Sequence, residues 1–169
     1  EKRYPHLYHR KTLFPELTLK RHSVLVETKN IAKNIVQQIE NMTSPSFAHV
    51  SREKFDIEKL AITQFPACLI VTTNEDREDL SMSERQSIIR YQLRCFVRGN
   101  QIDTLRNELV EGIEETLEKS RNRDITLAST NIHNVTTHIT NIEVVDRELP
   151  LGEVIVNVDV IYTYTKGVL

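Results

Sequence analysis

The strongest constraint on the fold is a strict alternation of apolar and polar residues near the C-terminal end, over residues 153–165. The apolar positions are Val154, Val156, Val158, Val160, Tyr162 and Tyr164. Asn157 and Asp159 occupy positions between them. Successive side chains of a strand point to opposite faces, so this stretch predicts a strand with one buried face and one wet face. Such strands are typical of antiparallel sheets.

A second alternating stretch covers residues 87–98. One face carries Ile89, Tyr91, Leu93, Cys95 and Val97, and the other carries Arg90, Gln92, Arg94 and Arg98, interrupted by Phe96. Shorter strands are expected at 47–51 and 67–73, and residues 132–145 have high β-propensity with blurred alternation. The charged residues 74–84 are interpreted as an exposed hairpin loop.

Two stretches have the spacing of amphipathic helices. Residues 23–42 carry an apolar stripe, and Ser44-Pro45 predicts where that helix ends. Residues 100–119 carry Leu105, Leu109, Ile113 and Leu117 at intervals of four, with Asn100 as the expected N-cap. Gly112 lies beside this second stripe, and a close approach of helix to sheet would explain a glycine there.

These elements predict an α+β fold, with a mostly antiparallel sheet of four to five strands packed on two helices. We expect a single domain over residues 23–169, preceded by an extended basic arm over residues 1–22. The arm contains six basic and two acidic residues, and Pro5 and Pro15 disfavour a helix there. Its candidate docking residues are Lys2, Arg3, Tyr4, Tyr8, Arg10 and Lys11.

Catalytic and metal-binding patterns are not found in the sequence. The four glycines form no phosphate-binding loop. His133 and His138 are five residues apart, which on a regular strand would place them on opposite faces. Cys68 and Cys95 lie in apolar stretches, where burial makes a thiol inert. We therefore expect no enzyme activity, no metal and no cofactor.

Charge defines two candidate interaction surfaces. Arg90, Arg94 and Arg98 are predicted to project from one sheet face, and Glu108, Glu111 and Glu115 from the outer side of the second helix. The arginines have three possible partners: a carboxylate across the sheet such as Asp159, the acidic helix of a neighbouring subunit, or nucleic acid phosphate. The overall net charge of −2 disfavours the third.

In the order of its elements the chain resembles the tail terminator (tail completion) proteins of long-tailed bacteriophages. The resemblance covers roughly residues 23–169. It rests on an N-terminal helix, Phe65-Pro66 leading into the strand 67–73, the charged stretch 74–84, the alternating strand 87–98 and the helix 103–119. The closing strand with Tyr162-Thr163-Tyr164 completes the order.

The resemblance implies a virion structural protein that forms a ring of six copies. The ring would cap the tail tube, stop its polymerisation and join it to the neck or head–tail connector, with the tail sheath as a further candidate partner. DNA would only pass through the channel, and no membrane is implied. The implied location is the tail–neck region of a virion assembled in bacterial cytoplasm. Five residues of the charged stretch are the tube-facing candidates: Glu75, Asp76, Arg77, Glu78 and Asp79.

Three alternatives stay open from the sequence. The first is another neck, head–tail connector or baseplate structural protein. The second is a nucleic-acid-binding module that uses the basic arm and the arginines, since basic and aromatic residues together bind single strands. The third is a thiol enzyme centred on Cys68 or Cys95.

Overall fold

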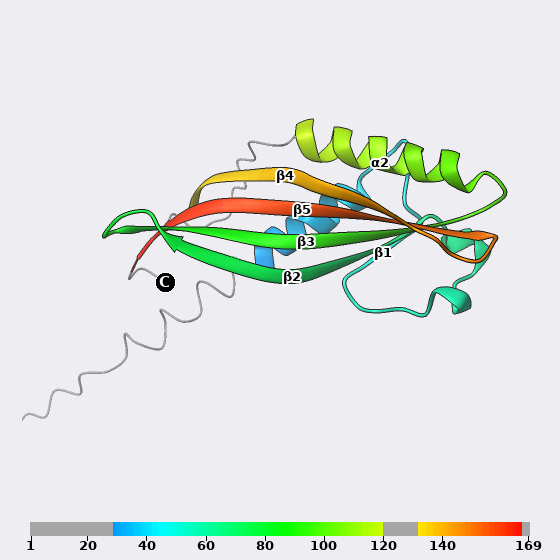
Figure 1. Ribbon diagram of the computed structural model, residues 1–169, viewed down its shortest axis with the longest axis horizontal. Helices are drawn as coiled ribbons and strands as arrows, with labels where there is room; N and C mark the ends of the chain where they lie inside the picture. Colours follow the sequence, from blue (N-terminus) through cyan, green and yellow to red (C-terminus); the bar gives the residue numbers. More distant parts are fainter. Residues whose placement is uncertain (1–28, 120–131, 167–169) are drawn as a thin grey trace, which may run out of the picture.

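The computed structural model describes residues 29–119 and 132–166, and Figure 1 shows their arrangement. Residues 29–40 are helical. The strands and the second helix that follow are β1 (His49–Ser51), β2 (Ala67–Asp79), β3 (Glu84–Arg98), α2 (Ile102–Lys119), β4 (Ile132–Val145) and β5 (Leu151–Thr165). Two short 3-10 helices, Ile57–Lys59 and Ile62–Gln64, lie between β1 and β2.

The strands form a five-stranded sheet in the order β1-β2-β3-β5-β4. The short strand β1 is parallel to β2, and every other neighbouring pair is antiparallel. The long central strands β3 and β5 are paired along their whole length, from Glu84 with Thr165 to Arg98 with Leu151. The predicted α+β class and mostly antiparallel sheet are confirmed.

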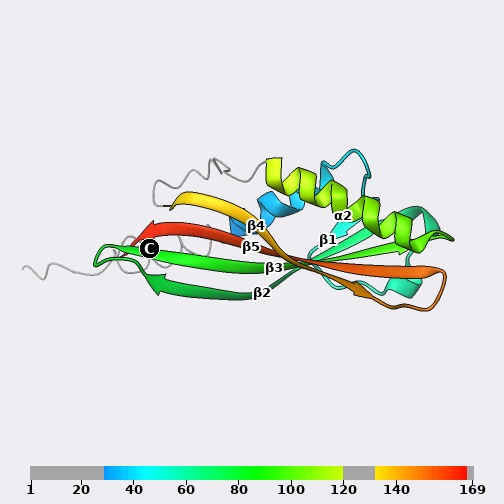
Figure 2. The ribbon, with the colours of Figure 1, turned by 45° about the horizontal axis from the view of Figure 1, so that its top comes forward.

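Both helices cover the same face of the sheet, as Figure 2 shows for α2. The alternating residues predicted to be apolar meet there, since Leu93 pairs with Val156 and Tyr91 with Val158. Residues 29–40 contribute Ile31, Ile35 and Ile39 to this core, and α2 contributes Leu109, Ile113 and Leu117. These helix side chains are at most 2% exposed. The single-sided apolar patterns of helix and strand thus fit together as expected.

A smaller apolar cluster on the opposite face explains why Phe96 interrupts the polar side of β3. Ala67, Leu69 and Phe96 are buried there, under side chains from the connection between β1 and β2. Phe55 lies edge-on to Phe96, with 5.9 Å between the ring centroids. This connection therefore covers one end of the sheet on the side away from the helices.

Gly112 allows another segment to approach α2 closely, but that segment is the one around Met42 and Pro45 and not the sheet. A Cβ atom at this position would lie 2.7 Å from Pro45 Cδ and 2.9 Å from Met42 Cε. The segment that follows the first helix therefore packs directly on the backbone of α2, and the expected helix-to-sheet contact is wrong in its partner. The second crowded glycine, Gly152, would bring a Cβ to 2.3 Å from Ile102 Cγ2.

The hairpin prediction for residues 74–84 is wrong in extent. Residues Asn74 to Asp79 continue β2, Glu84 begins β3, and only residues 80–83 connect them. The extension has charged residues on both faces, so it lacks the apolar alternation that identifies a strand. Its backbone nevertheless pairs in register, from Asn74 with Arg90 to Asp79 with Arg85.

Two other boundaries also differ from the prediction. Helix α2 begins at Ile102, and the Leu105 N–H donates to the Gln101 carbonyl oxygen at 3.1 Å, so Gln101 and not Asn100 precedes the first turn. β5 begins at Leu151, two residues earlier than predicted. The arm 1–22 lies outside the described residues, so the proposed division into arm and domain stays a prediction. In the described part, no helix has both the length and the apolar character needed to cross a membrane.

Candidate functional site

The three predicted arginines lie on the sheet face that points away from α2, and two of them hold carboxylates of the same chain. Arg90 forms an ion pair with Asp76 on β2, and its Nε lies 3.7 Å from Asp159 Oδ2 on β5. This is the cross-strand pairing anticipated for Asp159. The hydrogen-bonded carboxylate of Asp76 raises the pKa of the Arg90 guanidinium, as does the charge of Asp159.

Arg94 is the counter-ion of a buried glutamate. Its Nη2 lies 2.7 Å from Glu153 Oε1, while Arg147 Nη2 lies 2.5 Å from Glu153 Oε2. Glu153 is fully buried, whereas the two arginine side chains are 34% and 39% exposed. We name this arrangement the Glu153 clamp. Arg147 was not found by sequence reasoning, because it precedes the last strand in a polar turn that carries no periodic signal.

Arg98 differs from the other two arginines. It is exposed, and its guanidinium carbon lies 6.0 Å from the ring centroid of Phe65. Such a contact is worth about 0.5–1 kcal/mol at an exposed site. Arg98 thus keeps more freedom to meet another molecule than Arg90 or Arg94, and the amount of positive charge offered to a phosphate backbone is smaller than the sequence pattern suggested.

The acidic candidates lie together on the outer side of α2. Glu108, Glu111 and Glu115 are exposed, and with Ser44 and Pro45 they line an open groove of about 350 Å³. Lys119 forms an ion pair with Glu115, which lowers the pKa of that carboxyl. Because α2 covers the opposite face from the arginines, the two charged surfaces point away from each other.

The stem of the β2–β3 hairpin, which contains the five tube-facing candidates, is held by internal contacts. A register shift between Thr72 and Asn74 turns Glu75 toward the helix-covered face. There Glu75 Oε1 accepts hydrogen bonds from Ser87 Oγ at 2.6 Å, Arg77 Nε at 2.9 Å and Tyr162 Oη at 3.1 Å. Burial alone raises the pKa of Glu75, but the hydrogen bonds from Arg77 and Ser87 outweigh it and leave the pKa below its usual value.

A second ion-pair cluster fixes the end of the hairpin. Arg85 Nε lies 2.5 Å from Asp79 Oδ1, and Lys166 Nζ lies 2.9 Å from Asp79 Oδ2. The hydrogen bonds from Arg85 and then Lys166 lower the pKa of Asp79 to about 2. Lys166 Nζ also donates to the Ser81 carbonyl oxygen at 2.6 Å, which ties the end of β5 to the hairpin connection. Of the five candidates, Glu78 is exposed and has no ion pair among the described residues.

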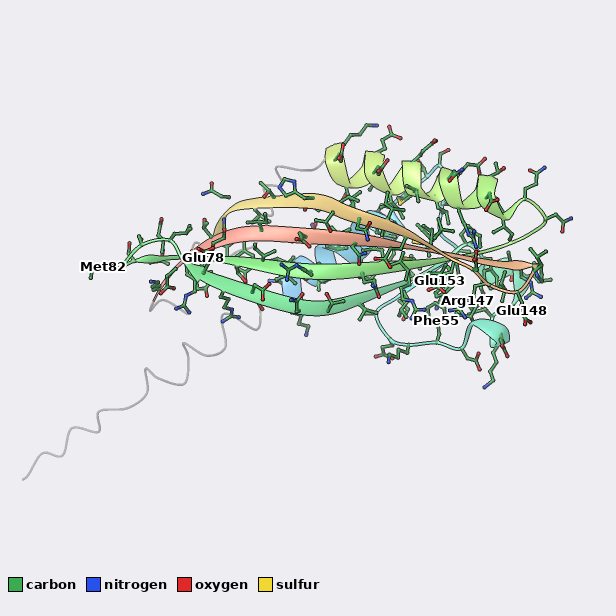
Figure 3. All side chains as sticks on the ribbon, viewed as in Figure 1. Phe55, Glu78, Met82, Arg147, Glu148 and Glu153 are labelled. Carbon is green, nitrogen blue, oxygen red and sulfur yellow. The ribbon has the colours of Figure 1, made fainter. Side chains whose placement is uncertain are left out.

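The residues 80–83, named here the hairpin tip, carry two exposed apolar side chains. Met82 is 98% exposed and Leu80 is 50% exposed. Among the described residues, Met82 lies at one end of the long axis in Figure 3. Neither residue was predicted as a contact residue from the sequence. The signal that could have identified them is an apolar residue within the otherwise charged stretch 74–84.

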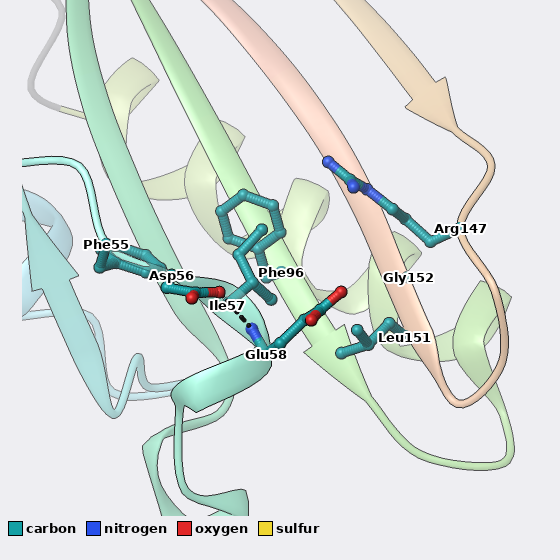
Figure 4. A pocket seen from close by; sticks show the side chains of 8 residues that line it. All are labelled: Phe55, Asp56, Ile57, Glu58, Phe96, Arg147, Leu151 and Gly152. Carbon is teal, nitrogen blue, oxygen red and sulfur yellow. Dashed lines mark hydrogen bonds between the residues drawn. The ribbon is translucent and has the colours of Figure 1, made fainter.

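A pocket of about 260 Å³, named here the end pocket, lies where the β1–β2 connection meets β3 and the start of β5. Phe55, Ile57, Phe96 and Leu151 supply its apolar lining. Asp56, Glu58 and Arg147 also line it, as Figure 4 shows, so it carries both signs of charge. Lys59 lies 3.1 Å from Asp56 and lowers the pKa of that carboxyl. This pocket was not anticipated, because the residues come from four separate segments.

The cysteines and the potential metal ligands were the residues considered for thiol catalysis and metal binding. Cys68 and Cys95 are fully buried with their Sγ atoms 3.8 Å apart, and burial raises the pKa of the Cys68 thiol. No group of three potential metal ligands occurs within residues 29–119 and 132–166. The strand faces of His133 and His138 do not follow from their odd spacing, because β4 has a register shift between His133 and Thr136.

The six candidates in the N-terminal arm lie outside the described residues, so their predicted docking role stays a prediction.

Comparison with known proteins gives limited information. No protein-family model matches the chain, and no curated protein matches it. Among solved structures, a chain of the virion of a native gene transfer agent particle is similar with a TM-score of 0.44 and 10% sequence identity. The similarity covers 79% of this chain and 92% of that one. A likeness of this strength assigns no function.

Proposed function

We propose that the protein is a virion structural protein, a phage tail terminator. In this proposal it forms a homo-oligomeric ring of six copies that caps the tail tube, stops tube polymerisation and joins the tail to the neck or head–tail connector. The protein works by binding and performs no catalysis. Its location is the tail–neck region of the virion.

The observation that carries the proposal is that the acidic groove of α2 and the exposed Arg98 lie on opposite sides of one sheet. A ring forms when two different patches of one subunit meet in neighbouring copies and the rotation closes. The acidic groove of α2 is one such patch, and the arginine face, with Arg98 as its least engaged member, is the other. The order of elements that resembles tail terminators supports the same proposal.

The remaining contacts follow from the same proposal. The hairpin stem, Glu75 to Asp79, meets the tail tube, and Glu78 is the stem residue best suited to an intermolecular ion pair. The arm 1–22 reaches an adjacent ring or the neck. Electrostatic complementarity of this type sets orientation and partner choice more than it sets affinity.

The test is an end-capping experiment. Purified protein is mixed with tubes assembled from the tail tube protein of the same phage, and the mixture is imaged in negative stain. We expect one ring at the head-proximal end of each tube and no further growth when tube subunits are added. Tubes that stay uncapped and continue to grow would rule out the terminator function.

A further inference from the structure

The hairpin tip is a rigidly held apolar projection. Asp79 is braced by Arg85 and Lys166, and the Lys166 N–H donates to the Ser83 carbonyl oxygen at 2.7 Å. These contacts fix the base of the tip while leaving Met82 and Leu80 outside the body of the fold. An apolar side chain on a backbone that is already held in place is the type of group that anchors a protein interface, because little backbone freedom is lost on binding.

The end pocket supplies the kind of surface that such a projection needs. Phe55 and Phe96 form an edge-on aromatic pair within its lining, and Ile57 and Leu151 extend the apolar surface. A flexible thioether packs well against aromatic rings. Leu149, which is 80% exposed, lies just before the start of β5 and enlarges the apolar surface at this end of the molecule.

The hairpin tip and the end pocket lie toward opposite ends of the long axis. Figure 3 shows Met82 at one end and Phe55, Arg147 and Glu148 toward the other. One copy cannot bring these two sites together, but a second copy can, in a head-to-tail contact. Such a contact joins two different patches and repeats by rotation, as a closed ring requires.

The charges around the two sites are compatible with this contact. The exposed carboxylates of Glu78 and Glu84 flank the hairpin tip. At the end pocket are Arg147, which also holds Glu153, and the neighbouring Lys59, which pairs with Asp56. In the other direction, Lys166 near the tip can face Glu58 at the pocket. The mixed signs on both sides favour one docking orientation.

We propose that the hairpin tip of one copy inserts Met82, supported by Leu80, into the end pocket of the next copy. This inference rests on the proposed ring and adds a contact to it. Glu78 on the stem remains available to the tail tube, and the tip, which lies beyond the stem, links the copies around the ring.

The test is cross-linking between two single-cysteine additions in the full chain. Met82→Cys and Glu58→Cys are made in separate chains, mixed, allowed to assemble and treated with a short bismaleimide. We expect a cross-linked dimer from the mixture and none from either variant alone. The native cysteines are fully buried and do not compete. Glu111→Cys, which is exposed on α2, replaces Glu58→Cys as the control and should give no dimer with Met82→Cys.

Each contrary result overturns a different part of the account. A ring of the expected mass without the Met82–Glu58 cross-link contradicts this inference and leaves the proposed function intact. Cross-linking of Met82→Cys only to itself, or only to added tail tube protein, also contradicts it. A chain that stays monomeric on its own and with tubes contradicts the ring itself.

A substitution gives an independent measure. Met82→Ser should weaken association between copies by at least about tenfold, since it removes the central apolar anchor. The urea midpoint of the monomer should stay unchanged, because Met82 is 98% exposed. Ile62→Ser is the matched control: Ile62 is also exposed, at 72%, and lies outside the end pocket lining. Equal association of Met82→Ser and the unaltered chain would contradict the inference.

Discussion

Arg94 and Glu153 form an ion pair in which the carboxylate is fully buried and the guanidinium remains partly exposed, with 2.7 Å between Nη2 and Oε1. The same carboxylate is held on its other oxygen by Arg147. A residue that the sequence pattern assigned to an intermolecular surface is therefore needed inside its own fold. This relationship changes which substitutions can test the proposed interface.

Arg94→Met should lower the free energy of unfolding by about 2–3 kcal/mol, because a buried charge that loses one partner is poorly compensated. Arg98→Met should change it by less than about 1 kcal/mol, since Arg98 makes only an exposed contact with Phe65. Urea unfolding of both variants measures the difference. Equal stability of the two would show that the Glu153 clamp contributes nothing.

A double-mutant cycle defines the Glu153 clamp further. Arg94→Met combined with Arg147→Met should cost more than the sum of the single changes, because the second loss leaves Glu153 with neither of its arginines. Strict additivity in urea unfolding would indicate that the two arginines act independently of the shared carboxylate.

Arg98 is the better position for testing the ring interface. Arg98→Glu should weaken association between copies while leaving the urea midpoint nearly unchanged, because the charge reversal affects an exposed side chain. Light scattering against protein concentration measures the effect, with Arg52→Glu as an exposed control that lies after β1. The same association for Arg98→Glu and the unaltered chain would remove Arg98 from the interface.

The hairpin stem should be sensitive to acid. The folded-state pKa of Glu75 is lowered, so its contribution to stability is present above the unfolded-state value of about 4.3 and is lost as the pH falls below it. Glu75→Gln should therefore be less stable than the unaltered chain at pH 7, and the gap should narrow between about pH 5 and pH 3. Urea midpoints across this range test the sign, and a gap that widens in acid would contradict it.

Gly112→Ala should destabilise the fold by about 1–2 kcal/mol, although alanine is the better helix former. The added methyl would meet Pro45 and Met42 at less than 3 Å. Gly99→Ala is the comparison, because its nearest contact is the side chain of Leu105 at 3.1 Å, which has more room to adjust. A gain in the thermal midpoint for Gly112→Ala would show that the first helix and its following segment do not pack on α2 as described.

Both cysteines should be unreactive in the native protein. Cys68 and Cys95 are 0% exposed, and burial raises the pKa of the Cys68 thiol, so little thiolate is available. A thiol reagent should modify neither residue in buffer and both in denaturant. Rapid modification of one cysteine in buffer would instead support the thiol enzyme considered from the sequence.

The helices and the long strands β3 and β5 were predictable because each buries only one face, which leaves a periodic apolar pattern in the sequence. The alternation of β5 and of the apolar side of β3 identified the residues that meet the helices, and the stripes of the helices identified the matching surface. The polar part of β2 was not predictable, since its strand structure comes from backbone pairing with β3 and from ion pairs such as Asp79 with Arg85. Apolar and polar residues alternate along a strand only where one of its faces is buried, so a strand with two exposed faces shows no such pattern.

For the candidate surfaces, the sequence predicted on which face the charged residues lie but not which of them are already paired within the chain. The sequence placed Arg90 and Arg94 on one face, but it contained no signal for the partners Asp76, Glu153 and Arg147, which come from other strands and a turn. The end pocket is assembled from separate segments in the same way. Long-range pairing decides which charged residues are already engaged and which remain for another molecule.

The most direct test of the central claim, that copies of this chain close into a ring, is the mass of the assembled protein. Light scattering of the purified chain should give a particle six times the 19.6 kDa of one chain, with no larger species as the concentration rises, and each capped tube should gain the mass of one such particle. A mass of one chain in solution together with no mass gained by the tubes, or a mass that grows without limit as in an open filament, would contradict ring closure.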